Sequence, residues 1–288
     1  MTDNMNIQWY PGHMTKTRRQ IEADLKLVDA VCEIVDARIP VSSRNPDIDA
    51  ICGDKPRMIV LNRMDLADPA ATKKWAEYFR RKGMAVIATD CKSKKGISAF
   101  TPAARLACAE KLERDAKRGM NRPLRVMVVG IPNVGKSTLI NQISGRKSAK
   151  AENRPGVTRG KQWVTVDSGL QLLDTPGILW PKFEDPEVGM MLAYTGAVKE
   201  GVIDLEELAY RLMELLHKLY PQTLLERYKV EAPEGTPGWQ LLEMAARKRG
   251  YLVSGGEVNT ERMAKVLLDE FRSGKLGNFT LELPEDMV

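Results

Sequence analysis

One stretch of eight residues constrains the fold more than any other part of this sequence. GIPNVGKS, residues Gly130–Ser137, fits the pattern G-x-x-x-x-G-K-S. It follows an apolar run, LRVMVVG, that predicts a buried strand, and it precedes TLINQISG, which predicts a helix. In this strand–loop–helix setting, backbone N–H groups and the start of the helix form a binding site for nucleotide phosphates.

The polar residues of this loop have distinct expected tasks. Lys136 reaches the β and γ phosphates, which makes it a predicted catalytic residue, and the Ser137 hydroxyl is a predicted ligand of Mg²⁺. We expect the nucleotide to contact Asn133, Val134, Gly135, Lys136, Ser137 and Thr138.

Two further segments complete the predicted phosphate and magnesium site. An apolar strand, LQLLD, leads into DTPG, where Asp174 is expected to hold Mg²⁺ through water and the Gly177 N–H to contact the γ phosphate. RPGVTRG lies between the two motifs, and its Thr158 is a predicted second magnesium ligand and catalytic residue on a switch loop.

A third motif predicts which base is bound. LNRMD, residues 61–65, ends an apolar strand and resembles the guanine-binding motif Asn-Lys-x-Asp of GTPases. The Asp65 carboxylate can accept two hydrogen bonds from guanine, whereas adenine would leave it unpaired. Arg63 replaces the usual Lys, and its flat guanidinium group can stack on the base. The alternative is a simple turn in which Asp65 caps a helix; the remaining predicted base contacts are Asn62 and, in TDCK, Thr89, Asp90 and Cys91.

Alternating strands and helices surround these motifs. Apolar runs at 30–37, 57–62 and 84–89 predict buried strands, helices are expected over 15–29, 69–82 and 97–118, and 161–177 predicts a hairpin. This alternation is typical of an α/β fold with a mostly parallel sheet and helices on both faces. Residues 181–288 have helical periodicity and predict a smaller all-α domain.

The order of the motifs is unusual. The guanine motif precedes the phosphate loop, whereas it comes last in familiar GTPases. In a parallel sheet all ligand-binding loops lie at the carboxyl ends of the strands, so joining the old termini and cutting elsewhere keeps each loop in place. We therefore predict a circularly permuted P-loop GTPase domain over 1–180. DTPG then leads into the helical domain at 181–288, which we expect to respond to the bound nucleotide.

Charge and cysteine content narrow the partners and the compartment. Residues 1–180 carry 31 Lys and Arg against 19 Asp and Glu, and residues 181–288 carry 13 against 19. The basic first part favours a polyanionic partner, although a solvated basic face explains it equally well. No apolar run reaches the ~20 residues of a membrane span. The four cysteines form no Cys-x-x-Cys pair, which favours a reducing cytoplasm over zinc or disulfides.

The motifs together resemble one family along nearly the whole chain. WYPGHM, DARIPVSSRNP, LNRMD, GIPNVGKSTLIN, PGVTRG, DTPGILWP and FRSGKLGNFTLELP are similar to segments of the circularly permuted ribosome assembly GTPases of the YlqF/RbgA type. The resemblance implies a GTPase in late assembly of the large ribosomal subunit, bound to its rRNA and proteins. We expect the subunit to stimulate hydrolysis and the protein to be a monomer away from the ribosome.

The resemblance also implies a catalytic histidine. Common small GTPases follow DTxG with a glutamine that orients the attacking water, but here the next residue is Ile178. The family's PGHM motif points to His13 instead, whose imidazole can accept a hydrogen bond from water. The alternatives are a structural histidine packed between Trp9 and Tyr10, or an RNA contact. Asn133 resembles the asparagine of potassium-activated GTPases, which suggests K⁺ as a second cofactor.

Two other functions remain open from the sequence. The first is a permuted GTPase of small-subunit maturation, which would add an oligonucleotide-binding barrel or a zinc module; this sequence has too few residues before the guanine motif for a barrel and no Cys/His cluster. The second is a nucleotide-gated rRNA-binding scaffold with little hydrolysis, which Ile178 would suit.

Overall fold

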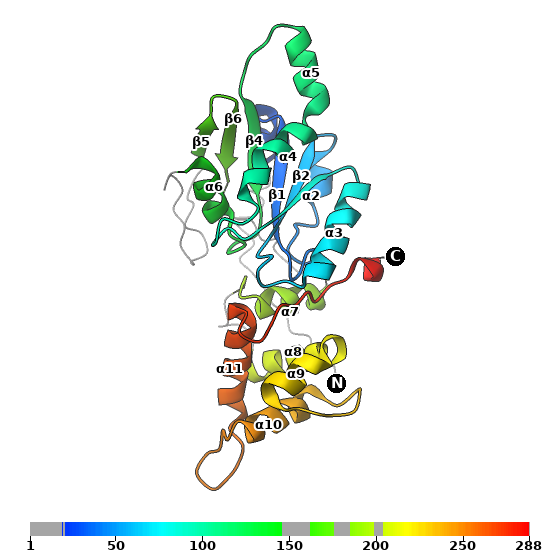
Figure 1. Cartoon of the computed structure of the whole chain (residues 1–288), viewed down its shortest axis with the longest axis vertical. Coiled ribbons are helices and arrows are strands. Elements are labelled where there is room, and N and C mark those ends of the chain that lie inside the picture. The colour runs from blue at the N-terminus through cyan, green and yellow to red at the C-terminus, as the bar shows by residue number, and fades with distance from the viewer. Residues whose placement is uncertain (1–18, 20, 146–161, 176–184, 199–203, 288) are drawn as a thin grey trace. The chain divides into compact units, whose positions relative to one another are not determined.

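The computed structural model describes residues 19, 21–145, 162–175, 185–198 and 204–287 (Figure 1). These residues form two compact units. An α/β unit contains the described residues up to 175 together with 282–287, and a helical unit contains 185–281. The boundary predicted near residue 180 lies outside the described residues, and the last few residues of the predicted helical domain pack with the α/β unit.

A six-stranded sheet forms the α/β unit. Its order is β3-β2-β1-β4-β6-β5. The first five strands in this order run parallel to one another, and β5 pairs antiparallel with β6 at the edge. The predicted mostly parallel sheet and the hairpin are therefore confirmed. The strands are β1 Ala30–Asp36, β2 Arg57–Asn62, β3 Ala85–Thr89, β4 Leu124–Val129, β5 Gln162–Asp167 and β6 Leu170–Asp174.

Helices cover both faces of this sheet, as predicted. On one face Val35 and Leu61 pack with Trp75 and Phe79 of helix α3 (Pro69–Arg81). The alternate residues of β1 and β2 are buried as well, which is typical of parallel strands covered on both faces. The other described helices of the unit are α2 Ile48–Cys52, α4 Phe100–Ala107, α5 Ala109–Lys117 and α6 Lys136–Ser144.

Two predicted helices differ in extent from the structure. The helix expected over 97–118 is a short 3-10 turn followed by α4 and α5, which are separated at Cys108, where φ is −109° and ψ is 18°. Of the helix expected over 15–29, residues 21–24 are α-helical and Leu25–Leu27 form a 3-10 turn. By contrast, α3 begins at residue 69, as predicted. The Asp68 carboxylate caps it by accepting hydrogen bonds from the N–H groups of Ala70 and Ala71.

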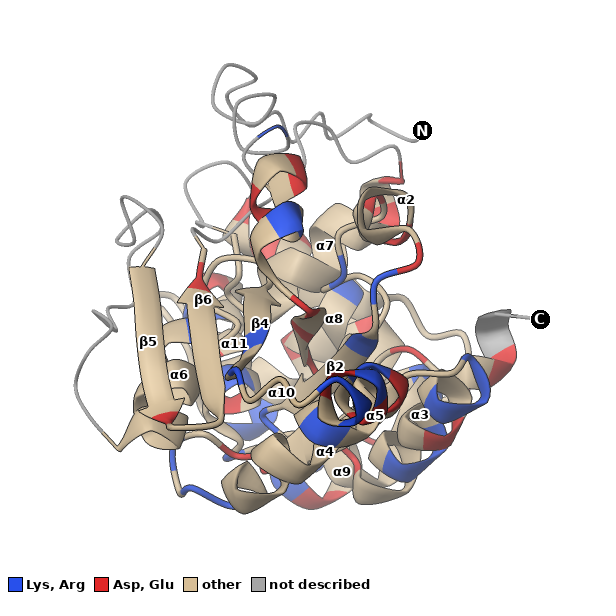
Figure 2. Cartoon of the chain, turned by 90° about the horizontal axis from the view of Figure 1, so that it is seen from above, with Lys and Arg blue, Asp and Glu red and all other residues tan. Residues whose placement is uncertain are grey.

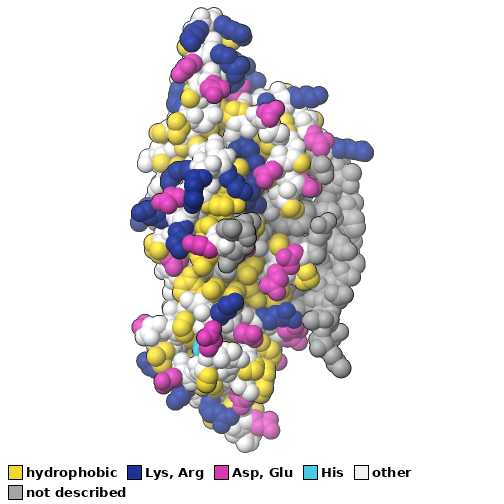
Figure 3. Space-filling view, turned by 90° about the vertical axis from the view of Figure 1, so that its right-hand side faces the viewer, with side chains coloured by type: hydrophobic (Ala, Val, Ile, Leu, Met, Phe, Trp, Pro, Cys, Tyr) yellow, Lys and Arg dark blue, Asp and Glu magenta, His cyan; other side chains and the backbone are white. Residues whose placement is uncertain are grey.

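Basic side chains are concentrated near one end of the α/β unit. In Figure 2 most of α5 is coloured as charged residues, blue for Lys and Arg and red for Asp and Glu. Figure 3 shows Lys and Arg side chains in the upper part of the view, where α5 lies in Figure 1. Arg114, Lys117, Arg118 and Arg122 are all exposed there. This surface is therefore suited to a polyanion.

The helical unit has a leucine-rich core. Leu208, Leu212 and Leu216 of α8 are buried, as the periodicity predicted. Asn259 caps α11 by accepting a hydrogen bond from the Arg262 N–H, and the helix ends at Gly274, where φ is 77°. Among the helices that the model describes, none is both long and apolar enough to cross a membrane. The helices are α7 Pro186–Tyr194, α8 Leu205–Leu219, α9 Pro221–Tyr228, α10 Gly238–Lys248 and α11 Thr260–Ser273.

Candidate functional site

The predicted binding residues meet at one edge of the sheet. Asn62 ends β2, Thr89 ends β3 and Asp174 ends β6, while the phosphate loop follows β4. Because these strands are parallel, their carboxyl ends lie along the same edge. The structure therefore brings the guanine motif and the phosphate loop together, although some 70 residues separate them in sequence.

The two glycines of the phosphate loop are required by close contacts. A Cβ atom at Gly130 would lie 2.6 Å from Cγ2 of Ile34, and one at Gly135 would lie 2.4 Å from Nδ2 of Asn62. Gly135 also has a φ of 101°, and Asn133 has a φ of 61°. Left-handed conformations at these two positions allow the loop to turn sharply before α6. The first N–H groups of a helix have no partner within the helix and can bind phosphate.

The expected phosphate and magnesium residues lie side by side. Nζ of Lys136 donates a hydrogen bond to Oδ1 of Asp174 at 2.5 Å, and both side chains are buried. Ser137 and Thr138 lie half-buried in the first turn of α6. A hydroxyl and a carboxylate are oxygen ligands that suit Mg²⁺, which takes only one or two carboxylates besides the substrate phosphates. The donor set around Ser137 and Asp174 therefore fits this ion.

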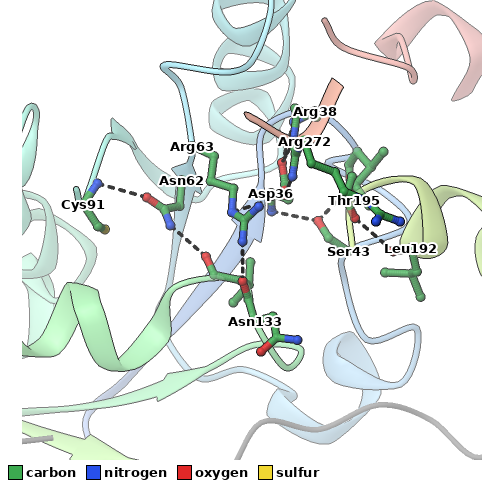
Figure 4. A network of polar contacts seen from close by, with 12 residues as sticks. Asp36, Arg38, Ser43, Asn62, Arg63, Cys91, Asn133, Leu192, Thr195 and Arg272 are labelled. Atoms are coloured by element: carbon green, nitrogen blue, oxygen red, sulfur yellow. Dashed lines mark hydrogen bonds and ion pairs between the residues drawn. The ribbon is translucent and has the colours of Figure 1, made fainter. Parts of the chain in front are cut away.

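Asn62 connects three loops through its side-chain amide (Figure 4). Its Nδ2 donates to the Val134 carbonyl at 2.7 Å. Its Oδ1 accepts hydrogen bonds from the Thr89 hydroxyl at 3.1 Å and from the Cys91 N–H at 3.3 Å. The end of β2, the loop after β3 and the phosphate loop are thus held together by one side chain.

Arg63, whose predicted stacking on the base stays a prediction, contacts two neighbouring segments of the protein. Its φ is 60°, and its guanidinium group donates to the Asn133 carbonyl at 2.6 Å. Its Nε lies 3.7 Å from Oδ2 of Asp36. In the structure this arginine links the guanine motif to the phosphate loop (Figure 4).

The two other aspartates predicted to bind the base, Asp65 and Asp90, differ in burial. Asp90 is buried, and its Oδ1 accepts hydrogen bonds from the N–H groups of Lys92 and Ser93 at 2.8 and 3.2 Å. Asp65 is exposed; partial burial and the nearby Asp90 carboxylate raise its pKa. Asp90 therefore shapes the loop after β3, whereas Asp65 presents its carboxylate at the surface.

A buried ion pair that no motif predicted lies beside the site. Nε and one terminal nitrogen of Arg38 donate to the two carboxylate oxygens of Asp36 at 3.0 and 2.7 Å. Burial acts to raise the pKa of Asp36, but Arg38 and Arg63 together lower it. The signal was present in the sequence, because DARIP begins with Asp36, the last residue of the buried strand β1. Asp36 thereby provides a fixed negative charge at the strand end next to Arg63.

Several predicted residues lie outside the described part of the chain. They are His13, Thr158, Gly177 and Ile178. Their predicted roles in water positioning, magnesium binding and γ-phosphate contact stay predictions.

Known proteins are similar to this chain over almost its whole length. A family model described as a 50S ribosome-binding GTPase matches residues 125–222. "Ribosome biogenesis GTPase A" of Priestia megaterium is 45% identical over 285 residues, with 98% of each chain covered. The protein of the same name from Thermotoga maritima is 34% identical, with 98% of this chain and 96% of the relative covered. "Mitochondrial ribosome-associated GTPase 1" of Mus musculus is 34% identical, with coverages of 96% and 90%.

Solved structures are similar as well. The GDP-bound structure of TM YlqF has a TM-score of 0.67 and 30% sequence identity, covering 93% of this chain and all of that one. The GNP-bound YlqF from T. maritima has a TM-score of 0.62 and 29% identity, with coverages of 94% and 99%.

Proposed function

Because the chain belongs to the family of ribosome biogenesis GTPase A proteins, and is thus a GTPase of ribosome assembly, we propose that it acts in late maturation of the large ribosomal subunit. The bound subunit stimulates its GTP hydrolysis. Away from the ribosome it is a monomer of the cytoplasm.

One observation carries the proposal of a single, complete guanine nucleotide site. The guanine motif contacts the phosphate loop twice, from Asn62 to the Val134 carbonyl and from Arg63 to the Asn133 carbonyl. A nucleotide that binds both motifs thus contacts two segments that are hydrogen-bonded to each other, although their order in the sequence is inverted. Asp65 accepts hydrogen bonds from guanine, which gives selectivity over adenine.

The phosphate end of the site follows from the same geometry. Lys136, which donates a hydrogen bond to Asp174 in the structure, would bind the β and γ phosphates. Ser137, Thr158 and, through water, Asp174 would hold Mg²⁺. Mg²⁺ supplies charge neutralisation at the phosphates.

His13 positions the water that attacks the γ phosphate, in place of the glutamine that Ile178 replaces. Asn133 would hold K⁺, which would stabilise the negative charge that develops on the phosphates. Turnover of His13→Ala in the presence of subunits, and rates in KCl against NaCl, test these two assignments. Undiminished turnover of the variant would contradict the first, and equal rates in the two salts would contradict the second.

The partner is supported by the distribution of charge. The exposed basic residues around α5 give the α/β unit a surface suited to the phosphates of rRNA. Proteins of the large subunit complete the binding site.

Co-sedimentation with purified subunits tests the proposed partner. The protein is centrifuged with large or small subunits in GDP or in a non-hydrolysable GTP analogue. We expect binding to the large subunit that is stronger with the GTP analogue than with GDP. Equal binding to both subunits, or to neither, would contradict the proposal.

A further inference from the structure

The end of the chain makes specific contacts with a loop of the α/β unit. The Glu282 carboxylate accepts hydrogen bonds from the Val41 N–H at 2.6 Å and from the Ser42 N–H at 3.0 Å. The indole N–H of Trp75 donates to the Glu282 carbonyl at 2.8 Å. All four residues belong to the α/β unit. One side chain thus receives two neighbouring backbone donors, and its own backbone is held by a buried tryptophan.

The loop that Glu282 binds also carries the ion pair next to the nucleotide site. Ser43 follows directly, and its hydroxyl accepts a hydrogen bond from the Asp36 N–H at 2.9 Å and donates to the Ile39 carbonyl at 2.7 Å. The Asp36 carboxylate in turn binds both the backbone and the side chain of Arg38. In the structure, the conformation of loop 37–44 therefore provides hydrogen-bond donors to the Asp36 carboxylate and to the Glu282 carboxylate at the same time.

Asp36 carries this contact on to the phosphate loop. Its Oδ2 lies 3.7 Å from Nε of Arg63, whose terminal nitrogen donates to the Asn133 carbonyl. Contacts thus run without a break from Glu282, through loop 37–44 and Asp36, to the left-handed turn at Asn133 (Figure 4 shows the part from Ser43 onward).

We propose that Glu282 is a positioning residue for the guanine nucleotide site, and that it links the helical unit to that site. The inference rests on the nucleotide site proposed above. The helical unit, 185–281, is joined to the α/β unit twice along the chain. Its beginning follows DTPG, and its end leads directly into Glu282. Along the chain, both junctions of the helical unit therefore adjoin segments that belong to the proposed nucleotide site or contact it through loop 37–44.

Linkage gives this proposal a quantitative form. If loop 37–44 is better ordered with nucleotide bound, nucleotide must strengthen the Glu282 contact by the same factor by which that contact strengthens nucleotide binding. Both directions can be measured on the full-length protein.

The first experiment compares GDP affinity among variants, with a fluorescent GDP analogue as the probe. Glu282→Ala removes the acceptor of two N–H groups, and Glu282→Gln retains one side-chain oxygen. The matched control is Glu285→Ala, three residues on, whose carboxylate pairs with Lys74 at 2.8 Å at the exposed surface. We expect the dissociation constant to rise about fivefold for Glu282→Ala, at the low end of typical coupling between sites. The dissociation constant of Glu282→Gln lies between those of wild type and Glu282→Ala, and that of Glu285→Ala equals the wild-type value.

The second experiment uses the wild-type protein, so it stands even where Glu282→Ala fails to fold. Hydrogen exchange of the Val41 and Ser42 amides is measured with and without GDP. We expect GDP to slow exchange of both amides. Unchanged exchange, or equal GDP affinity of folded Glu282→Ala and Glu285→Ala, would overturn the inference. A wild-type protein that does not bind GDP at all would instead refute the proposed nucleotide site.

Discussion

At the scale of single residues, side-chain amides and glycines fix the geometry of the nucleotide site. Asn62 uses its nitrogen as a donor to Val134 and its oxygen as an acceptor from Thr89 and Cys91. No other side chain of this size offers a donor and an acceptor in these two directions. Contacts within the protein therefore already constrain the identity of residue 62.

Asn62→Asp tests this role with almost no change of shape. The variant keeps an acceptor for Thr89 and Cys91 but places a carboxylate oxygen against the Val134 carbonyl, and an unmade buried hydrogen bond costs about 1–3 kcal/mol. We expect GDP binding to weaken about tenfold or more, since 1.4 kcal/mol corresponds to tenfold. Asn121→Asp, at an exposed position, is the control and leaves the affinity unchanged. Equal affinity of the two variants would contradict the role of Asn62.

Gly96, in the loop after β3, and Gly83, just before β3, form a matched pair for substitution by alanine. Both have a φ of 79°, but a Cβ atom at Gly96 would lie 2.1 Å from the Ala88 carbonyl oxygen, whereas Gly83 has open space. We expect Gly83→Ala to cost about 1 kcal/mol through its left-handed backbone alone. Gly96→Ala costs more, because the loop must also shift away from β3. Urea unfolding of both variants measures the difference; equal free energies of unfolding would contradict the close contact.

At the scale of helices and strands, ion pairs hold the helical unit together beside its apolar core. Glu270 of α11 binds Nε of Arg227 at 2.9 Å and the Tyr228 hydroxyl at 2.8 Å, both from α9. Arg249 lies 3.4 Å away at the end of α10. Three helices thus share one carboxylate.

This cluster predicts how the helical unit responds to acid. The hydrogen bond from Arg227 is the main cause that lowers the pKa of Glu270 below its usual value. The ionised carboxylate therefore adds stability above its unfolded pKa of about 4.3, and that stability is lost as the pH falls through the lowered folded pKa. We expect Glu270→Gln to be less stable than wild type at pH 7, and the difference to shrink toward pH 3.

Urea unfolding of the helical unit at pH 7, 5 and 3 measures this effect. The control is Glu261→Gln, which breaks an exposed pair with Lys265 within α11, and such surface pairs contribute about 0–1 kcal/mol. A constant difference between wild type and Glu270→Gln across this pH range would refute the assignment.

The elements were largely predictable because their signals are local. The strands of the sheet follow from short apolar runs, and the start of α3 follows from Asp68 and Pro69. No Gly or Pro marks the break between α4 and α5 in the sequence. The break falls at Cys108, which is buried.

Site residues that belong to a sequence motif were predictable, whereas contacts between segments distant in sequence were not. Asn62 and Lys136 were found from their motifs, whereas the contact of Glu282 with loop 37–44 joins residues some 240 positions apart. The hydrogen bond from Arg63 to the Asn133 carbonyl could not be predicted either, because Asn133 comes from another loop, and the stacking of Arg63 on the base stays a prediction.

At the scale of the whole molecule, charge is distributed unevenly along the chain. The first 180 residues are basic and the remainder is acidic. The exposed arginines and lysines around α5 contribute to the basic part. Phosphate contacts make RNA binding depend strongly on salt. Association with the subunit is thus expected to weaken as the salt concentration rises.

Charge reversal on α5 tests where this attraction acts. We expect the combined variant Arg114→Glu, Lys117→Glu and Arg118→Glu to bind large subunits more weakly and with a shallower salt dependence, because fewer phosphates are contacted. GDP affinity stays unchanged, since α5 lies outside the nucleotide site. Reversal of Lys248 and Lys265 in the helical unit is the control. Wild-type binding and salt dependence of the α5 variant would place the rRNA contact elsewhere.

The most direct test of the proposed function is the rate of GTP hydrolysis by the purified protein alone, with large subunits and with small subunits. We expect slow turnover of the protein alone and strong stimulation by large subunits only. Stimulation by small subunits, or by neither, would contradict a GTPase that acts on the large subunit.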